Sequence, residues 1–458
     1  MYESNHRKHI QRLGKRRGAR RKRSIVSDET FVLKIFMFLS LGVFLVGLVL
    51  CVRQAIMPSS AYEHVRYQRN GIEVSPNNLR SGVTNFPYFG TSTLDIENYK
   101  PAGGGRYPEW AFGDTPYAST ARIKKKSDAL ARERRVAIKN AMVHAWGGYK
   151  KYAFGMDELQ PISGTGNERW GGIGTILVDS LDTLWLMGLK TEFYEARDWV
   201  RDELSYDIDK KVSVFETTIR SLGGLLSAYD WSGDQAFLDA ATDLGDRLLK
   251  TFDSDSGLPQ TSVNLHSGRA ANRGGSNIAE MGTLQIEFRY LANATGNKEY
   301  AEKVESVFDA LHDLHPEDGL YLNDIRYVKG QAEFGKRGKL SFGGCGDSFY
   351  EYMLKLWLQG GKKETKYRDM YDESIEGMHK VLLQKSEPSG LNYLASIESS
   401  GAGNMQRSRV VHDMEHLACF TGGPLALGAH NDPLEANSER AQRDMRTSKA
   451  LTYSCYQM

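Results

Sequence analysis

Val214-Phe215-Glu216-Thr217-Thr218-Ile219-Arg220 is the stretch around which the rest of the chain can be interpreted. Apolar residues recur behind it at helical spacing, which predicts an amphipathic helix that runs to about Trp231. Glu216 and Arg220 lie four residues apart and therefore share one face of that helix. Such a pair is more often a surface salt bridge than a functional pair, so any chemistry must be argued from the rest of the chain.

Three further predicted helices place a carboxylate at or near their first residue, namely Asp179, Glu280 and Asp347. An apolar, aromatic-rich run follows each of these acids and ends at a glycine turn. One acid at the start of a helix is usually a cap or a partner of the helix dipole. Four acids at matching places favour equivalent helices whose acidic ends meet at one mouth.

Helical periodicity continues through most of the chain after about residue 132. The predicted helices lie near 172–187, 191–205, 215–231, 234–251, 277–294, 298–314, 347–358, 365–384, 411–429 and 435–458. Strand-like alternation is scarce, and in three turns an aromatic residue follows a glycine, as Phe193 follows Gly188. Helical hairpins that repeat in this way can close into a ring, so we predict an all-α fold, an α/α toroid with parallel inner helices.

A strongly basic segment precedes an apolar one near the N-terminus. Residues 7–23 hold ten lysines and arginines and no acid, whereas the whole chain has a net charge of +2. Alone, the basic run would fit nucleic-acid binding, but residues 35–52 form an apolar stretch about as long as a bilayer core requires. Positive charge before the span predicts a cytosolic N-terminus and a luminal remainder, and no cleavage site of small residues follows. We therefore expect a membrane partner and no nucleic acid.

This interpretation divides the chain into four parts. They are a cytosolic basic tail (1–30), a transmembrane signal anchor (31–53), a luminal stem (54–130) and a helical domain (131–458). The stem is rich in Asn, Gly, Pro and Ser without periodicity, a composition that suits a flexible spacer.

Cysteines and a glycosylation sequon would be modified only if the helical domain lies in the lumen. Cys345, Cys419 and Cys455 would face an oxidising compartment, whereas Cys51 would lie in the span. Asn293-Ala294-Thr295 is the only N-glycosylation sequon in the sequence.

Five stretches of the helical domain carry a family resemblance when they are taken in order. They are AW at 145–146 with YKKYAFGMDEL at 149–159, VDSLDTL at 178–184, FETTIR at 215–220, GDSFYEY at 346–352 and HLACF at 416–420. On these residues the domain resembles the class I α-1,2-mannosidases, glycoside hydrolase family 47, over roughly residues 133–458. The anchor and stem also fit members of the Golgi and the endoplasmic reticulum.

The resemblance implies a fold, a reaction and a cofactor. The fold would be a seven-hairpin α/α barrel, and the reaction a calcium-dependent, inverting hydrolysis of terminal α-1,2-linked mannose on high-mannose N-glycans. Ca²⁺ favours oxygen ligands and can hold sugar hydroxyls and waters together. Inversion needs an acid for the leaving oxygen and a base for a water on the opposite face, with carboxyls roughly 6.5–9.5 Å apart. The implied location is the Golgi or endoplasmic reticulum membrane, with a single-pass type II topology.

The resemblance also implies roles for individual side chains. The family's general acid corresponds to Glu216, acting directly or through a water, and its second essential carboxylate corresponds to Asp347. Arg220 and His416 correspond to residues that contact the sugar. Taken singly, Asp347 is as readily a helix cap and His416 a satisfied core histidine.

Three more acids correspond to residues that line the family's pocket, namely Asp182, Glu280 and Glu351. The alternative for Asp182 and Glu351 is that they are partners within a polar network of the helices.

Three cysteines of the helical domain also correspond to positions that are characteristic of the family. Cys419 and Cys455 correspond to the family's bridging pair, and a disulfide between them would close a loop of 36 residues (455 minus 419). Cys345 stands two residues before Asp347, where endoplasmic-reticulum members usually carry arginine and Golgi members leucine. A short, apolar cysteine is closer to the Golgi pattern.

Two stretches of the family are not found in these 458 residues. They are Leu-Arg-Pro-Glu, which carries the assigned general base, and Asn-Thr-Glu, whose threonine binds calcium. We therefore expect no metal ligand in this sequence, and either a truncated gene model or a short form with little activity. The alternative function is a non-hydrolytic, mannose-binding quality-control protein of the same fold. Another α/α barrel, such as a terpene cyclase, would need an aspartate-rich magnesium motif, which the sequence lacks.

Overall fold

The computed structural model describes residues 121–254, 256–271, 275–335, 338–399, 408–435 and 438–458. The predicted basic tail, the membrane anchor and residues 54–120 of the predicted stem lie outside these ranges. The chain divides into two units, Met1–Leu79 and Arg80–Met458, and all described residues belong to the second. Within the described part, no helix is both long and apolar enough to cross a membrane.

Helix α4 spans Ala121–Ala153 and so begins inside the predicted stem. Residues 121–130 are helical in the structure. The reason is local, because residues 121–146 contain no glycine or proline and are rich in alanine, arginine and lysine, which favour helix.

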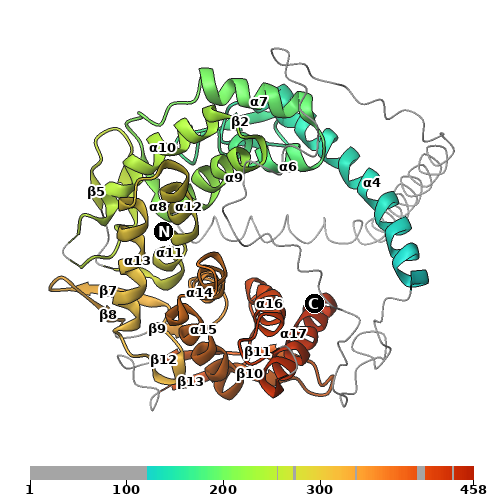
Figure 1. Cartoon of the computed structure of the whole chain (residues 1–458), viewed down its shortest axis with the longest axis vertical. Coiled ribbons are helices and arrows are strands. Elements are labelled where there is room, and N and C mark those ends of the chain that lie inside the picture. The colour runs from blue at the N-terminus through green and yellow to red at the C-terminus, as the bar shows by residue number, and fades with distance from the viewer. Residues whose placement is uncertain (1–120, 255, 272–274, 336–337, 400–407, 436–437) are drawn as a thin grey trace, which may run out of the picture. The chain divides into compact units, whose positions relative to one another are not determined.

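Consecutive helices of the described part pack against each other in five pairs. The pairs are α6 (Leu181–Leu186) with α7 (Lys190–Asp202), α9 (Gly223–Ser232) with α10 (Gln235–Leu249), α12 (Gln285–Thr295) with α13 (Glu299–His312), α14 (Asp347–Gln359) with α15 (Thr365–Gly377), and α16 (Gly422–His430) with α17 (Glu439–Gln457). The first members also contact one another in succession, α6 with α9, α9 with α12, α12 with α14 and α14 with α16. They form an inner row, and Figure 1 shows the pairs following one another along an arc from green to red.

Three turns between paired helices carry the predicted glycine–aromatic repeat. Gly188, Gly233 and Gly296 have φ angles of 68°, 66° and 78°, in the left-handed region that glycine enters without steric cost. The aromatic residues that follow these turns are buried in the core, namely Phe193, Phe237 and Tyr300. The repeat therefore reflects two needs, a left-handed residue at each turn and a large apolar anchor on each outer helix.

Short antiparallel strands accompany the helices, which corrects the expectation of an all-α domain. The described part has two hairpins, β1 (Glu158–Gln160) with β2 (Thr165–Asn167) and β10 (Leu383–Lys385) with β11 (Asn392–Leu394). It also has three sheets of three strands, ordered β3-β4-β5, β6-β7-β8 and β13-β12-β9. The strands of these sheets are β3 (Lys211–Ser213), β4 (Ser262–Asn264), β5 (Ala270–Ala271), β6 (Gly275–Asn277), β7 (Asp324–Val328), β8 (Gln331–Phe334), β9 (Gly338–Leu340), β12 (Ser396–Ser399) and β13 (Ser408–Val411). Strands this short carry too few residues for a period-two pattern to be visible in the sequence.

The strands position the segments that carry the predicted site. Strand β3 leads directly into α8 (Val214–Thr217), and β6 leads directly into α11 (Ile278–Gly282). Strand β13 ends at Val411, the first residue of the helix predicted near 411–429, and helical structure starts only at the 3-10 helix η6 (His416–Thr421). The sheets thus lie at the acid-bearing ends of the helices.

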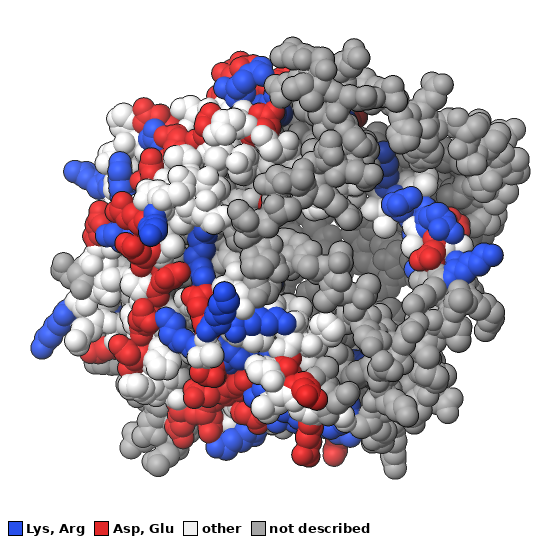
Figure 2. Space-filling view, viewed as in Figure 1, with Lys and Arg blue, Asp and Glu red and all other residues white. Residues whose placement is uncertain are grey.

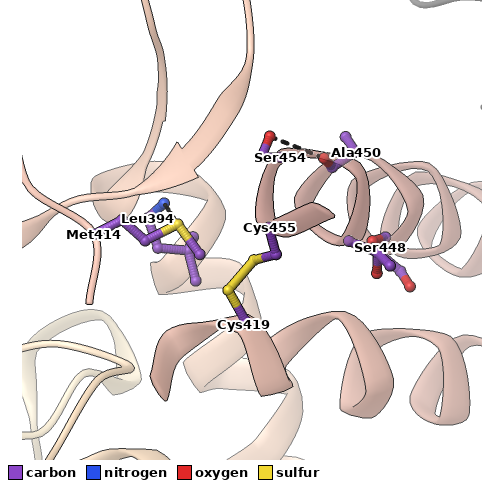
Figure 3. Close-up of a disulfide and its surroundings, with 8 residues drawn as sticks. Leu394, Met414, Cys419, Ser448, Ala450, Ser454 and Cys455 are labelled. Carbon is purple, nitrogen blue, oxygen red and sulfur yellow. Dashed lines mark hydrogen bonds between the residues drawn. A yellow bond between two sulfur atoms is a disulfide. The ribbon is translucent and has the colours of Figure 1, made fainter. Parts of the chain in front are cut away.

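The predicted disulfide is present. Cys419 and Cys455 are bonded, with their Cα atoms 5.9 Å apart, and the bond ties η6 to the last turn of α17 (Figure 3). Among the described residues, Cys345 is a free cysteine and is exposed.

Charges on the described surface are mixed. On the face in Figure 2, lysine and arginine side chains alternate with aspartate and glutamate side chains.

Candidate active site

Glu216 and Arg220 occupy a locally distorted helix. The Ser213 hydroxyl caps α8 by accepting a hydrogen bond from the backbone N–H of Glu216 at 3.3 Å. Arg220 lies in the following π-helical turn, η1 (Thr218–Leu222), a type of distortion that often marks functional sites. Arg220 Nε donates to Glu216 Oε2 at 2.9 Å, and the two side chains keep 38% and 27% of their surface exposed. A ligand could therefore reach the pair.

Arg220 has a second carboxylate partner, which distinguishes this pair from an ordinary salt bridge within a helix. Its guanidinium lies 3.6 Å from Asp179 Oδ2, at the end of the short helix α5 (Thr175–Asp179). Burial raises the pKa of Asp179, and Arg220 counteracts part of that effect. Asp179 stood out in the sequence as an acid near a helix start but was not among the predicted site residues. The structure places it with Glu216.

Trp170 completes this part of the site. The Arg220 guanidinium lies 5.3 Å from the centre of the Trp170 ring. The indole Nε1 donates to Glu158 Oε1 at 2.8 Å, and Asn167 donates to the other oxygen at 3.0 Å, which together lower the pKa of Glu158. We call Glu158, Trp170, Asp179, Glu216 and Arg220 the Arg220 cluster. A half-buried indole among charged groups offers an apolar face with polar contacts around it, as sugar sites require.

Buried Asp157 holds the loop that carries Trp170. Its carboxylate accepts hydrogen bonds from the backbone N–H groups of Trp170 at 2.9 Å, Gly172 at 2.8 Å and Ile173 at 2.8 Å. It also accepts one from the Thr175 hydroxyl at 3.1 Å, in the first residue of α5. One carboxylate therefore fixes both the loop with Trp170 and the helix that ends in Asp179.

A second group of residues surrounds Asp347. Asn277 caps α11 by accepting the N–H of Glu280 at 2.9 Å, and the Ser276 hydroxyl donates to Glu280 Oε2 at 2.7 Å. The N–H of Ala279 donates to the backbone carbonyl of Cys345 at 3.1 Å, which joins α11 to the segment before Asp347. Glu280 therefore lies beside that segment.

Buried Asn323 fixes the segment that leads into Asp347. Its side-chain amide donates to the Gly344 carbonyl at 3.1 Å, and its backbone carbonyl accepts the N–H of Ile278 at 2.9 Å. A Cβ atom on Gly346 would lie 2.4 Å from the Ser341 carbonyl oxygen, so only glycine fits this close approach. The first residue of α14 is thus held tightly in place.

Asp347 itself is half-buried at the first position of α14. Its Oδ1 accepts the N–H of Ser348 at 2.9 Å. Burial raises the pKa of Asp347 despite that hydrogen bond, and the nearby acids Glu351 and Glu415 raise it further. A carboxyl in such surroundings can exchange protons closer to neutral pH than an exposed aspartate does.

His416 begins η6 and is exposed, which excludes the alternative of a core histidine. Its neighbour Glu415 accepts the N–H of Gly344 at 2.7 Å and pairs with Lys339, and these contacts lower the pKa of Glu415. His416 is thereby attached next to the segment that precedes Asp347. We call Glu280, Cys345, Asp347, Glu415 and His416 the Asp347 cluster.

The other two predicted lining acids have partners within the helices. Asp182 Oδ2 accepts a hydrogen bond from the Ser227 hydroxyl at 2.9 Å, which ties α6 to α9. Glu351 pairs with Lys355 one turn later on α14. These contacts match the alternative of a polar network, although Asp182 acts electrostatically on Asp179, and Glu351 on Asp347.

Glu287 is an acid that the sequence interpretation missed. It lies on α12, where the Tyr352 hydroxyl of α14 donates to its Oε1 at 2.7 Å. Its Oε2 is buried, and no partner for it lies among the described residues. Burial raises the pKa of Glu287 to about 7. Its position seven residues after Glu280, on a helix with an apolar buried face, is the signal that could have revealed it.

The two clusters lie on neighbouring elements, because α8 contacts α11. The structure thus joins Asp179 to Glu216 and Glu280 to the segment before Asp347. In the described residues, no group of three or more His, Cys, Asp or Glu side chains is arranged to hold a metal ion.

Residues 141–458 match the model of Glycosyl hydrolase family 47. The chain belongs to this family. It is 41% identical over 336 residues to a mannosyl-oligosaccharide 1,2-alpha-mannosidase of Arabidopsis thaliana, with 72% of this chain and 57% of that relative covered. It is 42% identical over 329 residues to an endoplasmic reticulum mannosyl-oligosaccharide 1,2-alpha-mannosidase of Homo sapiens, with 71% and 44% covered. The chain thus spans about half the length of the curated relatives it matches.

A solved structure of an alpha-1,2-mannosidase shares the fold. The alpha-1,2-mannosidase from Trichoderma reesei superposes with a TM-score of 0.62 at 27% identity, covering 70% of this chain and 67% of that structure. The family resemblance predicted from the five stretches is therefore confirmed.

Proposed function

We propose that this family 47 chain is an α-mannosidase that hydrolyses terminal α-1,2-linked mannose on high-mannose N-glycans with inversion of configuration. The names of the relatives support the reaction class, since both are mannosyl-oligosaccharide 1,2-alpha-mannosidases. The observation that carries the proposal is the Arg220 cluster, in which one guanidinium contacts Glu216, Asp179 and the face of Trp170.

In this proposal, Glu216 acts as the general acid. It transfers a proton to the leaving glycosidic oxygen, directly or through one water, while the C1–O bond breaks and a water attacks C1 from the opposite face. A general base takes the proton of that water, and family membership assigns this base to the Leu-Arg-Pro-Glu stretch, which is not found in these 458 residues. Arg220 orients the Glu216 carboxyl through the Nε–Oε2 hydrogen bond of 2.9 Å. The negative charge of Asp347, the second carboxylate, would stabilise the cationic sugar ring of the transition state.

The remaining residues would bind the sugar. Trp170 supplies an apolar surface for one pyranose ring. Glu280 and the exposed His416 supply polar contacts at the Asp347 cluster, and Glu351, which acts electrostatically on Asp347, supplies another nearby. Glu287 and Asp182 lie between the inner helices and would fix their spacing.

Calcium is the cofactor that we propose from family membership. The described acids do not form a ligand set by themselves, so no step above depends on the ion. When bound, Ca²⁺ would supply oxygen coordination to sugar hydroxyls and waters. Chelation should abolish turnover and added Ca²⁺ should restore it, whereas chelator-resistant turnover would contradict this part of the proposal.

The proposed location is the Golgi or endoplasmic reticulum membrane, with the catalytic domain in the lumen. The basic run at 7–23 before the apolar stretch at 35–52 supports this topology. One relative is named as an endoplasmic reticulum enzyme.

The central test is a mannose-release assay on a high-mannose glycan, with protein expressed from the complete transcript. NMR of the first released sugar should show the β anomer, as inversion requires. Glu216→Gln keeps the size of the side chain but removes its ionisable proton, so we expect kcat to fall by about 10²–10⁴-fold. Glu195→Gln is the matched control, because Glu195 pairs with Lys150 at 2.5 Å on the surface outside both clusters. Equal activity of Glu216→Gln and the wild type would leave Glu216 as a salt-bridge partner of Arg220 and overturn the proposal.

A further inference from the structure

We propose that Asn293 carries an N-linked oligosaccharide. Asn293-Ala294-Thr295 is the only sequon in the sequence, and the residue between Asn and Thr is alanine, not proline. Asn293 is exposed in the last turn of α12. In the described part of the chain, no hydrogen bond holds its side-chain amide in the folded domain.

The surroundings of Asn293 leave room for a bulky glycan. Residues 295–299 are all exposed, and 296–298 form the turn between α12 and α13. The Thr295 hydroxyl donates to the Leu291 carbonyl at 2.7 Å and accepts the N–H of Asn297 at 3.2 Å, so the turn stays ordered without help from Asn293.

The neighbouring side chains on α12 already have partners. The Tyr290 hydroxyl donates to Asp230 at 2.6 Å, and Arg289 pairs with Glu364 at 2.6 Å. The helix packs into the core through other positions, which are Gln285, Phe288, Leu291 and Ala292. A sugar on Asn293 would therefore displace no core contact and break no ion pair.

The position also keeps a glycan away from the candidate active site. Asn293 lies six residues beyond Glu287, which is about 9 Å farther along the helix axis. Glu216 and Glu280 lie where strands enter helices, and Glu280 precedes the first residue of α12, whereas Asn293 lies in the last turn of α12. We therefore expect the glycan to leave the substrate path open.

The chemistry requires a lipid diphosphate-linked oligosaccharide and its transferase in the lumen. The Asn293 amide nitrogen forms a bond to C1 of the first sugar, the C1–O bond to the diphosphate breaks, and the diphosphate leaves with that electron pair. The amide nitrogen loses one proton. This inference rests on the luminal placement of the domain in the proposed function.

The test is treatment with peptide N-glycosidase F of the full chain expressed in a eukaryotic secretory pathway, followed by gel mobility and intact mass. We expect the wild type and Thr295→Ser to lose the mass of one glycan, and Asn293→Gln and Thr295→Ala to carry none. Asn293→Gln should keep the mannose-release activity of the wild type, because the residue touches neither cluster.

A relocated sequon separates the two ways in which the inference could fail. Glu299→Thr in the Asn293→Gln background places a threonine two residues after Asn297 and so creates a sequon at Asn297, in the same exposed turn. Glycosylation of this variant together with an unmodified wild type would overturn the assignment of Asn293 alone. Absence of a glycan from both would overturn the luminal placement as well.

Discussion

The role of Arg220 is indicated by its contacts in the folded domain and not by its spacing from Glu216 alone. Its spacing from Glu216 is that of a common helix salt bridge, worth only a few tenths of a kcal/mol on a surface. In the structure the same guanidinium also contacts Asp179 and lies over Trp170. A surface salt bridge needs neither of these contacts, whereas a sugar site can use both.

At this scale, Trp170 should contribute to sugar binding. Trp170→Ala removes the apolar surface beside Arg220, so we expect KM to rise by roughly 5–30-fold, equivalent to about 1–2 kcal/mol. The value of kcat should change little, because the ring would contact the substrate equally in the ground and transition states. Trp231→Ala is the control, since Trp231 is 46% exposed and belongs to neither cluster. An unchanged KM for Trp170→Ala would place the sugar elsewhere.

Glu287 should make the stability of the domain depend on pH. Burial raises its pKa from the ordinary value of 4.5 to about 7 in the folded state, so the folded state binds more protons than the unfolded state between these values. The free energy of unfolding of the wild type should therefore fall as pH rises from about 4.5 to about 7, and then level off. Glu287→Gln cannot ionise, so its free energy of unfolding should not show this decrease.

Urea unfolding at several pH values would measure this effect. The stability of Glu287→Gln relative to the wild type should increase across the window by roughly 1–3 kcal/mol. Glu195→Gln, on the surface, should show no such slope. A difference that does not change with pH would mean that Glu287 ionises normally in the folded protein.

At the scale of elements, the candidate site depends on how strands enter helices. Strand β3 is followed directly by α8, which carries Glu216, and β6 is followed directly by α11, which carries Glu280. Caps from Ser213 and Asn277 begin these two helices in the same way, with the acid three residues after the cap. The acids are thus placed by backbone hydrogen bonds that do not depend on substrate.

The Cys419–Cys455 disulfide should stabilise the last helix pair. It closes a loop of 36 residues between η6 and α17, so replacing both cysteines by serine should lower the free energy of unfolding by about 3–4 kcal/mol. Denaturant unfolding in the absence of reductant would measure the loss, and reductant should reproduce it in the wild type. Cys345→Ser is the control, because Cys345 is free. Equal stability of the double variant and the wild type would contradict a structural role for this bond.

At the scale of the whole molecule, the proposed function places the helical domain in the lumen. The predicted anchor at 31–53 lies outside the described residues, so its topology stays a prediction from the sequence. In sealed microsomes, added protease should remove an epitope within residues 1–33 and spare one in the helical domain. Detergent should expose both epitopes. Protection of the N-terminal epitope with loss of the domain would reverse the proposed orientation.

The sequence by itself determined those features that depend on neighbours along the chain. Most predicted helices are present because apolar spacing and glycine turns act locally, and the Glu216–Arg220 contact follows directly from the rise of a helix. Family motifs added the Cys419–Cys455 pair, which spacing alone would not have identified.

Only the tertiary structure decided the features that depend on distant segments. Asp179 joins Arg220, and Glu287 is buried against Tyr352, because separate helices pack side by side. Three strand pairings also join distant segments, namely β3 with β4, β6 with β7 and β9 with β12. Spacing along a helix is set by covalent geometry, whereas burial and pKa are set by what packs around a residue, and no local pattern in the sequence specifies that.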